Sequence, residues 1–512
     1  MSERLGLGFL LLTFIAALIL FFNLGGIPLL DPDEPVYAET AKEMINFHDF
    51  LSPRIFGEYW YDKPPMFYWL VAGSFSLFGV GEFAARFPSA LLGLICVIWV
   101  YSSGTRLFEQ RAGMMGALVL ATSVEFFYLG KAAVTDITLT LFLTISLLSF
   151  IEKRYYLFYI GAALATVTKG PIGLLFPGAV VFLYMLATRN FSELFKMKIP
   201  GGTILYLVIA LPWYLVMYQL HGNPFVDTFI GFHNITRFTS PEHPEGVLWY
   251  YFIPVLILGF LPWTAVMAQA LWKSLFDARE DSRKLLFLLI WAGFIFVFFS
   301  ISRTKLISYI LPMFPPLAMV VGWYINRISD WRYGFRPIAW PIVLTILSVL
   351  IWVALFLGVK AMPDLLAGAI VTAGLFAVMV FGVWYYIWRW DIDKAFWLQV
   401  GAMTLCSLVL MTMLFPQAAP AFHSRDIAKE FSAYYDRKSP VYVAKFLHPG
   451  FAFYSDVYGI ELKQDQAGKI IASQEKLYLI VRRSEYNALG AADQQKLTIL
   501  ATSDEKMLLL KP

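Results

Sequence analysis

Residues 338–358 read IAWPIVLTILSVLIWVALFLG, an apolar run that no Asp, Glu, Lys or Arg interrupts. Because about 20 mostly apolar residues cross the hydrocarbon core of a bilayer as a helix, this run predicts a membrane-spanning helix. The composition of the whole chain agrees: of 512 residues, 59% are hydrophobic and 15% are charged, whereas roughly 25% are charged in soluble domains. The chain therefore has too little charge to cover a water-soluble surface of this size.

Twelve more runs have the same character, which predicts a polytopic α-helical membrane protein with about thirteen transmembrane helices. We expect the first run to be retained as a helix, because no small-residue cleavage site follows it. A shorter aromatic run, Pro64–Phe78, is typical of a helix that lies along the membrane interface. The thirteen runs begin near Leu5, Arg86, Ala112, Val134, Leu157, Pro171, Gly201, Val247, Leu285, Leu306, Ile338, Pro363 and Phe396.

The distribution of Lys and Arg between alternate loops predicts the orientation. One set of loops holds 17 Lys or Arg in 58 residues, and the opposite short loops hold 9 in 96. The positive-inside rule makes the first set cytoplasmic. The first set comprises residues 1–4, 106–111, 152–156, 189–200, 273–284, 326–337 and 389–395, and the outer set comprises 28–85, 131–133, 169, 221–246, 302–305 and 359–362.

Hydropathy falls and charge rises from Pro416 onward. We therefore predict two domains: a membrane domain over 1–415, whose first outer loop is 28–85, and a small soluble α/β domain over 416–512 on the outer side. In the second domain, 440–445 and 476–481 have the pattern of strands, and 424–436 and 484–489 have the pattern of helices.

Several function classes are disfavoured. Cys96 and Cys406 lie in apolar runs, so a disulfide framework is excluded. The net charge is +4 and the basic residues are scattered singly, which argues against nucleic acid as a partner. A phosphate-binding loop and a dinucleotide-binding glycine pattern are absent from the sequence, which argues against a nucleotide cofactor and against ATP-driven transport.

Carboxylates concentrate on the predicted outer side. Asp33 and Glu34 lie just after the first span, and Asp136 begins the fourth. Paired carboxylates at the membrane surface could act as a general base, orient a hydroxyl or bind a cation. The alternatives are a solvated loop for the first acids and an N-terminal helix acid for Asp136.

Outer-side bases form a second pattern, because a base at membrane depth is costly unless it is paired. A lipid phosphate would supply the partner, and the alternative is interfacial snorkelling. His233 with a loop carboxylate could hold a divalent cation, although lone histidines usually form only hydrogen bonds. The bases at or near the span ends, or outside the densest acidic stretch, are Lys63, Lys131, Lys169, Arg237, Arg303, Lys305 and Lys360.

Ten short motifs in this order resemble the bacterial aminoarabinose transferases that modify lipid A, relatives of the protein O-mannosyltransferases in the GT-C superfamily. The resemblance spans roughly residues 5–330, with a similar layout beyond. The motifs are Asp33-Glu34, Tyr37-Ala38-Glu39, Tyr61-Asp62-Lys63-Pro64, Tyr68-Trp69, Thr168-Lys169-Gly170, Pro212-Trp213, His233 to Phe238, Trp249-Tyr250-Tyr251, Pro262-Trp263, and Arg303-Thr304-Lys305-Leu306 to Tyr309-Ile310-Leu311-Pro312.

The resemblance implies an inverting glycosyltransferase of the bacterial inner membrane, with its active site on the periplasmic face. Its donor would be a sugar on undecaprenyl phosphate and its acceptor lipid A or another periplasmic molecule. The family's two acids correspond to Asp33, with Glu34 beside it, and Asp136. Its phosphate ligands correspond to Lys63, Arg237 and Tyr309, and its metal-binding Glu and His to Asp62 and His233.

Two alternatives remain open at the level of the sequence. The same fold could use a protein or another glycan as acceptor, because sugar pockets are built from dispersed residues. A non-enzymatic lipid or solute transporter is the other class, and it is less favoured because the charges lie on one side and no internal repeat is visible.

Overall fold

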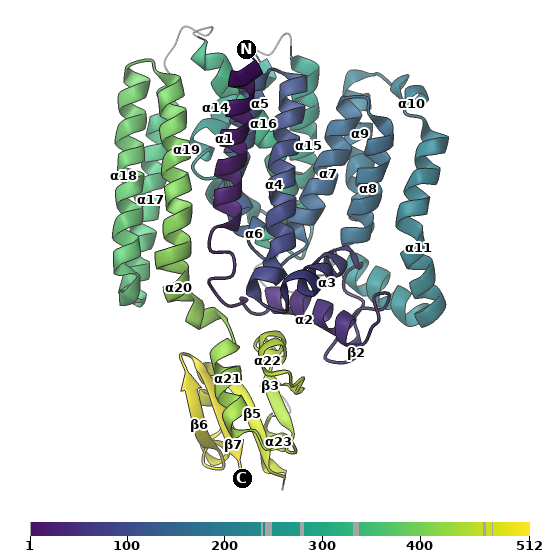
Figure 1. Cartoon of the computed structure of the whole chain (residues 1–512), viewed down its shortest axis with the longest axis vertical. Coiled ribbons are helices and arrows are strands. Elements are labelled where there is room, and N and C mark those ends of the chain that lie inside the picture. The colour runs from purple at the N-terminus through teal and green to yellow at the C-terminus, as the bar shows by residue number, and fades with distance from the viewer. Residues whose placement is uncertain are drawn as a thin grey trace. The chain divides into compact units, whose positions relative to one another are not determined.

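The computed structural model describes residues 2–236, 239–240, 248–276, 281–330, 337–463, 467–473 and 475–512. The chain divides into two compact units, each built from segments far apart in the sequence (Figure 1). The first unit contains Met1–Phe22, Tyr61–Phe67 and Ser89–Met411. The second contains Asn23–Trp60, Tyr68–Pro88 and Thr412–Pro512.

The first unit is a bundle of helices. Helix α4, Glu82–Leu107, starts in the second unit and continues through the first. The other elements of the bundle are α1 (Ser2–Phe21), α5 (Gln110–Ala121), α6 (Val124–Gly130), α7 (Asp136–Ile151), α8 (Tyr155–Lys169), α9 (Ile172–Thr188), α10 (Glu193–Lys196), α11 (Ile199–Val226), η1 (Asp227–Thr236), α13 (Phe252–Gly259), α14 (Thr264–Phe276), α15 (Ser282–Ile301), η3 (Ile307–Met313), α16 (Phe314–Ser329), α17 (Ala339–Ala361), η4 (Pro363–Leu365), α18 (Leu366–Trp388) and α19 (Ile392–Val409).

Each of the thirteen apolar runs coincides with a helix or a bent helix pair, which confirms the polytopic helical fold. Among the described residues, seven helices are long and apolar enough to span a membrane, and two bent pairs raise the number to nine. The bends are 67° between α5 and α6 and 107° between α13 and α14. Helices α7 and α8 have only 16 and 15 residues, about 23 Å at the rise of an α-helix, so their ends lie close to the apolar layer.

Two glycines allow α5 and α16 to approach closely. A Cβ at Gly322 would lie 2.3 Å from the backbone nitrogen of Gly116, a distance that no side chain tolerates. Small residues at a helix crossing let backbones pack directly, which is how helices associate where lipid removes the hydrophobic drive. Helix α16 accordingly lies inside the bundle, with almost all of its residues buried.

Ion pairs join five of the loops that we predict to be cytoplasmic. Arg106 pairs with Glu152 at 2.8 Å, and Arg327 pairs with Asp281 at 3.7 Å. Arg111 pairs with Asp330 at 3.1 Å and also with Asp393. These loops therefore lie at one end of the bundle, as the predicted topology requires.

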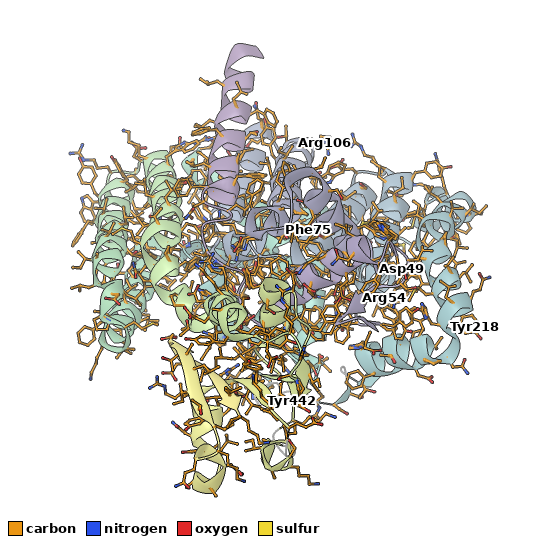
Figure 2. All side chains as sticks on the ribbon, turned by 60° about the horizontal axis from the view of Figure 1, so that its bottom comes forward. Asp49, Arg54, Phe75, Arg106, Tyr218 and Tyr442 are labelled. Atoms are coloured by element: carbon orange, nitrogen blue, oxygen red, sulfur yellow. The ribbon has the colours of Figure 1, made fainter. Side chains whose placement is uncertain are left out.

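The second unit combines the first outer loop with the C-terminal segment. Its loop carries a turn in which Asp49 and Arg54 lie 3.5 Å apart (Figure 2). Its elements are α2 (Asp33–Asn46), β1 (Arg54–Ile55), β2 (Glu58–Tyr59), most of α3 (Met66–Phe78), α20 (Phe415–Ala418), η6 (Ala419–Phe422), α21 (Arg425–Tyr434), β3 (Val441–Ala444), α22 (His448–Ser455), β4 (Ile460–Leu462), α23 (Ala467–Ala472), β5 (Leu477–Arg482), α24 (Arg483–Asn487), α25 (Ala491–Gln494), β6 (Thr498–Ser503) and β7 (Lys506–Lys511).

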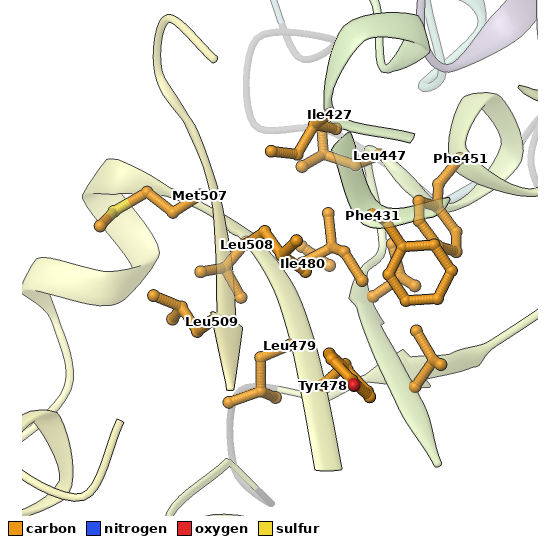
Figure 3. Packing of buried hydrophobic residues seen from close by; sticks show 14 of the residues in the cluster. Ile427, Phe431, Leu447, Phe451, Tyr478, Leu479, Ile480, Met507, Leu508 and Leu509 are labelled. Atoms are coloured by element: carbon orange, nitrogen blue, oxygen red, sulfur yellow. The ribbon is translucent and has the colours of Figure 1, made fainter. Parts of the chain in front are cut away.

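Five of these strands form a mixed sheet in the order β4-β3-β5-β7-β6. Strand β3 pairs in parallel with β4 and β5, whereas β7 is antiparallel to β5 and β6. The central strand β5 is an almost unbroken apolar run, which is typical of a strand covered on both faces. Phe431 and Phe451 pack with Tyr478 and Ile480 in this core (Figure 3).

The four predicted elements of the C-terminal segment are confirmed as α21, β3, β5 and α24. Within this unit the outer loop packs on that segment. Lys42 of α2 lies 2.6 Å from Asp456, and the Tyr454 hydroxyl accepts a 2.7 Å hydrogen bond from the backbone N–H of Leu29. The division at residue 415 stays a prediction, since the compact unit draws on both sides of it.

Asp31 is the most perturbed carboxyl of this unit. Its side chain is buried, accepts a hydrogen bond from Ser424, and lies over Gly450, where a Cβ would overlap its Oδ1. Burial raises the pKa of Asp31 to about 8, and the Ser424 hydroxyl and the charge of Lys506 only partly oppose that rise. Burial likewise raises the pKa of Glu39 to about 7.

The raised pKa values predict that the second unit loses stability as the pH rises. In the unfolded chain Asp31 ionises near pH 4, so between pH 4 and 8 the folded state binds more protons, and unfolding becomes easier with each pH step until about pH 8. The apparent unfolding temperature in detergent should therefore fall from pH 5 to 8, and the Asp31→Asn variant should show a shallower fall. Equal slopes for the two proteins would contradict this.

Candidate functional site

Three predicted site residues meet in the first unit. The Asp62 Oδ1 atom lies 2.8 Å from the Lys63 ammonium and 2.7 Å from Nδ1 of His233. The three side chains are 8 to 14% exposed. We call Asp62, Lys63 and His233 the Asp62 cluster.

The end of α11 shapes the position of His233. Gly222 adopts φ 60°, a conformation that favours glycine, and the helix kinks there before η1. Beyond the kink Phe225 stacks on Phe229 with ring centroids 5.5 Å apart. Tyr61 packs against Phe225 at 5.7 Å. These contacts hold η1 beside residues 61–63.

A second cluster combines Asp136, Lys169 and Tyr309, which we call the Asp136 cluster. Lys169 ends α8 and donates a 2.8 Å hydrogen bond to Asp136 at the start of α7. The same ammonium lies 4.9 Å from the ring centre of Tyr309 in η3. Both charged side chains are at most 10% exposed. The Lys169 ammonium is therefore held in place with little access to water.

Both clusters lie at the same end of the first unit. The Tyr159 hydroxyl near the start of α8 donates to the Met197 carbonyl just before α11, and the Tyr214 hydroxyl of α11 donates to the Thr166 carbonyl. Helices α8 and α11 therefore run in the same direction, as Figure 1 also shows. Lys169 at the end of α8 and His233 beyond the end of α11 consequently share one end of the bundle, opposite Arg106 and Glu152.

The other outer-side bases have different surroundings. Lys131 caps the end of α1 by donating to the carbonyls of Leu20 at 3.1 Å and Phe22 at 2.6 Å. Lys305 donates to the Ser302 carbonyl, and its burial together with the charge of Arg303 lowers the pKa of its ammonium. The side chain of Arg303 is exposed. Arg237 lies outside the described residues.

Asp33 and Glu34 belong to the second unit. Asp33 is exposed at the first position of α2. Glu34 is buried, and its oxygens lie 2.8 and 2.6 Å from the Arg86 guanidinium. The remaining Arg86 donors reach the carbonyls of Ile27 and Pro28, both at 2.8 Å. With Leu30 N–H also donating to Glu34, both carboxylate oxygens are already engaged, which favours a structural role.

The Asp62 cluster by itself is a poor match to a metal site. A zinc site uses three or four protein ligands, whereas Asp62 and His233 are two. No group of three His, Cys, Asp or Glu able to hold a metal is present among the described residues. The Lys63 ammonium also already neutralises the Asp62 oxygen. The divalent metal stays a prediction, and no chemical step is assigned to it.

The sequence does not show which bases pair with two of the predicted acids, Asp136 and Glu34. Lys169 was visible as an outer-side base at a span end, but only the antiparallel packing of α7 and α8 brings it to Asp136. Arg86 is separated from Glu34 by 52 positions, and it lies in the second turn of α4, where it resembles any base that flanks an apolar run. A buried base at a span end is a signal that some acid must neutralise it.

Several known proteins are similar in sequence to part of this chain. Residues 62–215 match the family model described as dolichyl-phosphate-mannose-protein mannosyltransferase. An uncharacterized protein of Aquifex aeolicus is 34% identical over 328 residues, which cover 62% of this chain and 64% of that protein. The undecaprenyl phosphate-alpha-4-amino-4-deoxy-L-arabinose arabinosyl transferase of Edwardsiella ictaluri is 30% identical over 337 residues, 63% of this chain and 60% of that protein. The chain thus matches these curated relatives over about three fifths of their length.

Solved structures share the fold. ArnT from Cupriavidus metallidurans, bound to undecaprenyl phosphate, superposes with a TM-score of 0.83 at 24% identity and covers 98% of each chain. An oligosaccharyltransferase, AglB from Archaeoglobus fulgidus, reaches 0.51 at 13% identity over 88% of this chain and 64% of that one. The chain is therefore a polytopic membrane protein with the GT-C type of fold. The predicted resemblance to the aminoarabinose transferases is confirmed.

The Glu34–Arg86 pair predicts a large stability effect. Glu34→Gln leaves the buried guanidinium without a countercharge, and breaking a buried pair costs about 3 to 5 kcal/mol. The matched variant Glu152→Gln breaks a similar bidentate pair with Arg106, whose side chain is 34% exposed, so its cost should stay near 1 kcal/mol or below. Thermal unfolding of the two variants in detergent measures the difference. Equal losses would contradict the structural role of Glu34.

Proposed function

We propose that this protein is a glycosyltransferase of the bacterial inner membrane that moves a sugar from a polyprenyl phosphate to a periplasmic acceptor. The observation that carries the proposal is the pair of largely shielded lysines, Lys63 and Lys169, each held by a carboxylate at one end of the bundle. That end is opposite the loops that the positive-inside rule makes cytoplasmic. The fold shared with ArnT over almost the whole chain supports the same activity.

The negative charge that develops on the leaving phosphate explains why lysines are needed at this site. The acceptor oxygen attacks the anomeric carbon from the face opposite the phosphate, the bond from that carbon to the phosphate oxygen breaks, and the sugar is transferred with inversion. The leaving lipid phosphate gains negative charge in the transition state. A fixed ammonium in a water-poor site stabilises that charge more than water does. Lys63 is oriented by Asp62, which also contacts His233 of η1, so we assign Lys63 to the phosphate.

The acceptor decides whether a base is required. A hydroxyl acceptor must lose a proton during attack, and Asp33, exposed at the start of α2, is the residue we assign as its base. A lipid A phosphate is already ionised and needs no strong base. In that case Asp33 orients the acceptor or the donor. Lipid A is the acceptor that the aminoarabinose transferase resemblance favours.

A protein acceptor is the second candidate. One observation favours it: residues 62–215, which include the Asp62 and Lys169 positions, match a model named for protein mannosyltransferases. The two acceptors are separated by supplying purified protein with labelled sugar on synthetic undecaprenyl phosphate, together with lipid A or a protein substrate. Label on lipid A supports our proposal, label on protein supports the alternative, and label on neither contradicts both.

Removal of the Lys63 ammonium should weaken the use of the donor. With Lys63→Ala we expect kcat/KM for the donor to fall about 100-fold, in the range found when one donor to a developing anion is removed. Lys360→Ala is the control, since Lys360 is an exposed outer-side base at the end of α17. Similar kinetics for both variants would remove Lys63 from the phosphate site.

Lys169 allows a matched test of the Asp136 cluster. Lys169→Met leaves Asp136 as a buried, unpaired charge and should reduce the transfer rate by at least about ten-fold, which corresponds to about 1.4 kcal/mol of transition-state stabilisation. Lys198→Met removes an equivalent Lys–aromatic contact, 4.8 Å from the Tyr156 ring, at an exposed position. Its activity should stay within two-fold of wild type. Equal activity of the two variants would argue that the cluster is only structural.

A further inference from the structure

Glu125 is a buried carboxyl that the proposed mechanism leaves unused. It lies in the first turn of α6, directly after the 67° bend that follows α5. The residue is 4% exposed. Neither carboxyl oxygen accepts or donates a hydrogen bond to any residue within the described part of the chain.

The packing around Glu125 leaves room for its carboxyl group. A Cβ placed on Gly259, the last residue of α13, would lie 2.3 Å from Glu125 Oε2 and 3.2 Å from the ring of Phe314. Glycine at this position therefore clears a space in an otherwise apolar neighbourhood. The backbone N–H of Val124 donates to the Leu261 carbonyl at 3.2 Å, which fixes α6 beside the bend between α13 and α14.

The same stretch of chain leads from Glu125 to the Asp136 cluster. Helix α6 ends at Gly130, Lys131 caps the end of α1, and α7 begins at Asp136. Elements α6, α7 and η3 pack on one another, and Asp136 is close enough to act electrostatically on Glu125. The carboxyl thus lies on the Lys169 side of the bundle, at the end where we place the chemistry.

A carboxyl without a hydrogen-bond partner is an unfavourable group to bury in this space. Burying a polar group without a hydrogen bond costs free energy that an apolar side chain of similar size would not. Ionisable residues at membrane depth therefore usually serve a function. Two acids and one lysine, Glu125, Asp136 and Lys169, would attract a group that donates hydrogen bonds or carries positive charge.

We propose that Glu125 binds the transferred sugar, by accepting a hydrogen bond from an ammonium or a hydroxyl group of its ring. This inference rests on the proposed function and deepens it, because it adds a residue that selects the sugar. An ammonium gains more from the contact than a hydroxyl does, since a charge-assisted hydrogen bond is stronger. Glu125 therefore favours an amino sugar.

The test measures binding of three probes: undecaprenyl phosphate alone, undecaprenyl phosphate carrying 4-amino-4-deoxy-L-arabinose, and undecaprenyl phosphate carrying L-arabinose. In Glu125→Leu we expect both sugar-bearing lipids to bind at least about ten-fold more weakly, with binding of the sugar-free lipid unchanged. In Glu125→Gln the amino sugar should lose its advantage over the hydroxyl sugar. Glu125→Leu should unfold at or above the wild-type temperature, because the unpartnered carboxyl is removed, and Glu125→Gln should unfold near the wild-type temperature, because its amide is equally unpartnered.

Two failures are distinguishable. If both Glu125 variants bind all three lipids as the wild type does, or if the wild type binds the sugar-bearing lipids no better than the sugar-free one, Glu125 is a core residue and the inference is overturned. If the wild type discriminates between the lipids but transfers no sugar to any acceptor, the proposed function fails while the binding assignment stands. The measurement of binding does not depend on turnover.

Discussion

The pairing of buried charge is the constraint on which this structure depends. In a chain with so little charge, each base that lies near the apolar layer needs a partner, because no water is available to solvate it. Lys169 has Asp136, Lys63 has Asp62, and Lys131 has the open carbonyls at the end of α1. In the second unit the Arg86 guanidinium donates five hydrogen bonds, to Glu34 and to backbone carbonyls of the loop before α2. Each pairing ties together segments that lie far apart in the sequence.

These pairings also divide the predicted acids by role. Glu34 and Asp33 are adjacent in sequence, yet one is locked by Arg86 and the other is exposed at the start of α2. Asp62 bridges a lysine and a histidine, which orients Lys63 and leaves little need for a metal to neutralise its charge. Glu125 alone among these carboxyls has no hydrogen-bond partner within the described residues. The lack of a hydrogen-bond partner distinguishes Glu125, which we assign to sugar binding, from Glu34, whose oxygens are engaged by Arg86.

Much of the fold was predictable because its signal is local. A run such as 338–358 specifies a helix without reference to any other part of the chain, and the alternating and apolar patterns at 440–445 and 476–481 correctly predicted β3 and β5. The bends between helices were harder to predict from the sequence. Nothing local to Ser123 predicts the 67° bend. Gly259 and Pro262 do signal a break between α13 and α14, but its angle of 107° depends on the helices packed against it. Strands β6 and β7 were not among the predicted elements, although Lys506–Lys511 carries an apolar core, and the structure pairs β7 with both β5 and β6.

The sequence by itself determined the membrane class, the helices, the orientation rule and the residue types of the site, because each of these depends on composition and short-range periodicity. Tertiary structure alone decided which acid meets which base. Asp136 reaches Lys169 across the α7–α8 hairpin, His233 reaches Asp62 across 171 positions, and Glu34 is removed from the pool of available acids by Arg86. The physical reason is that the Coulomb energy of a buried pair depends on separations of a few ångströms, and such separations are set by packing between helices rather than by distance along the chain.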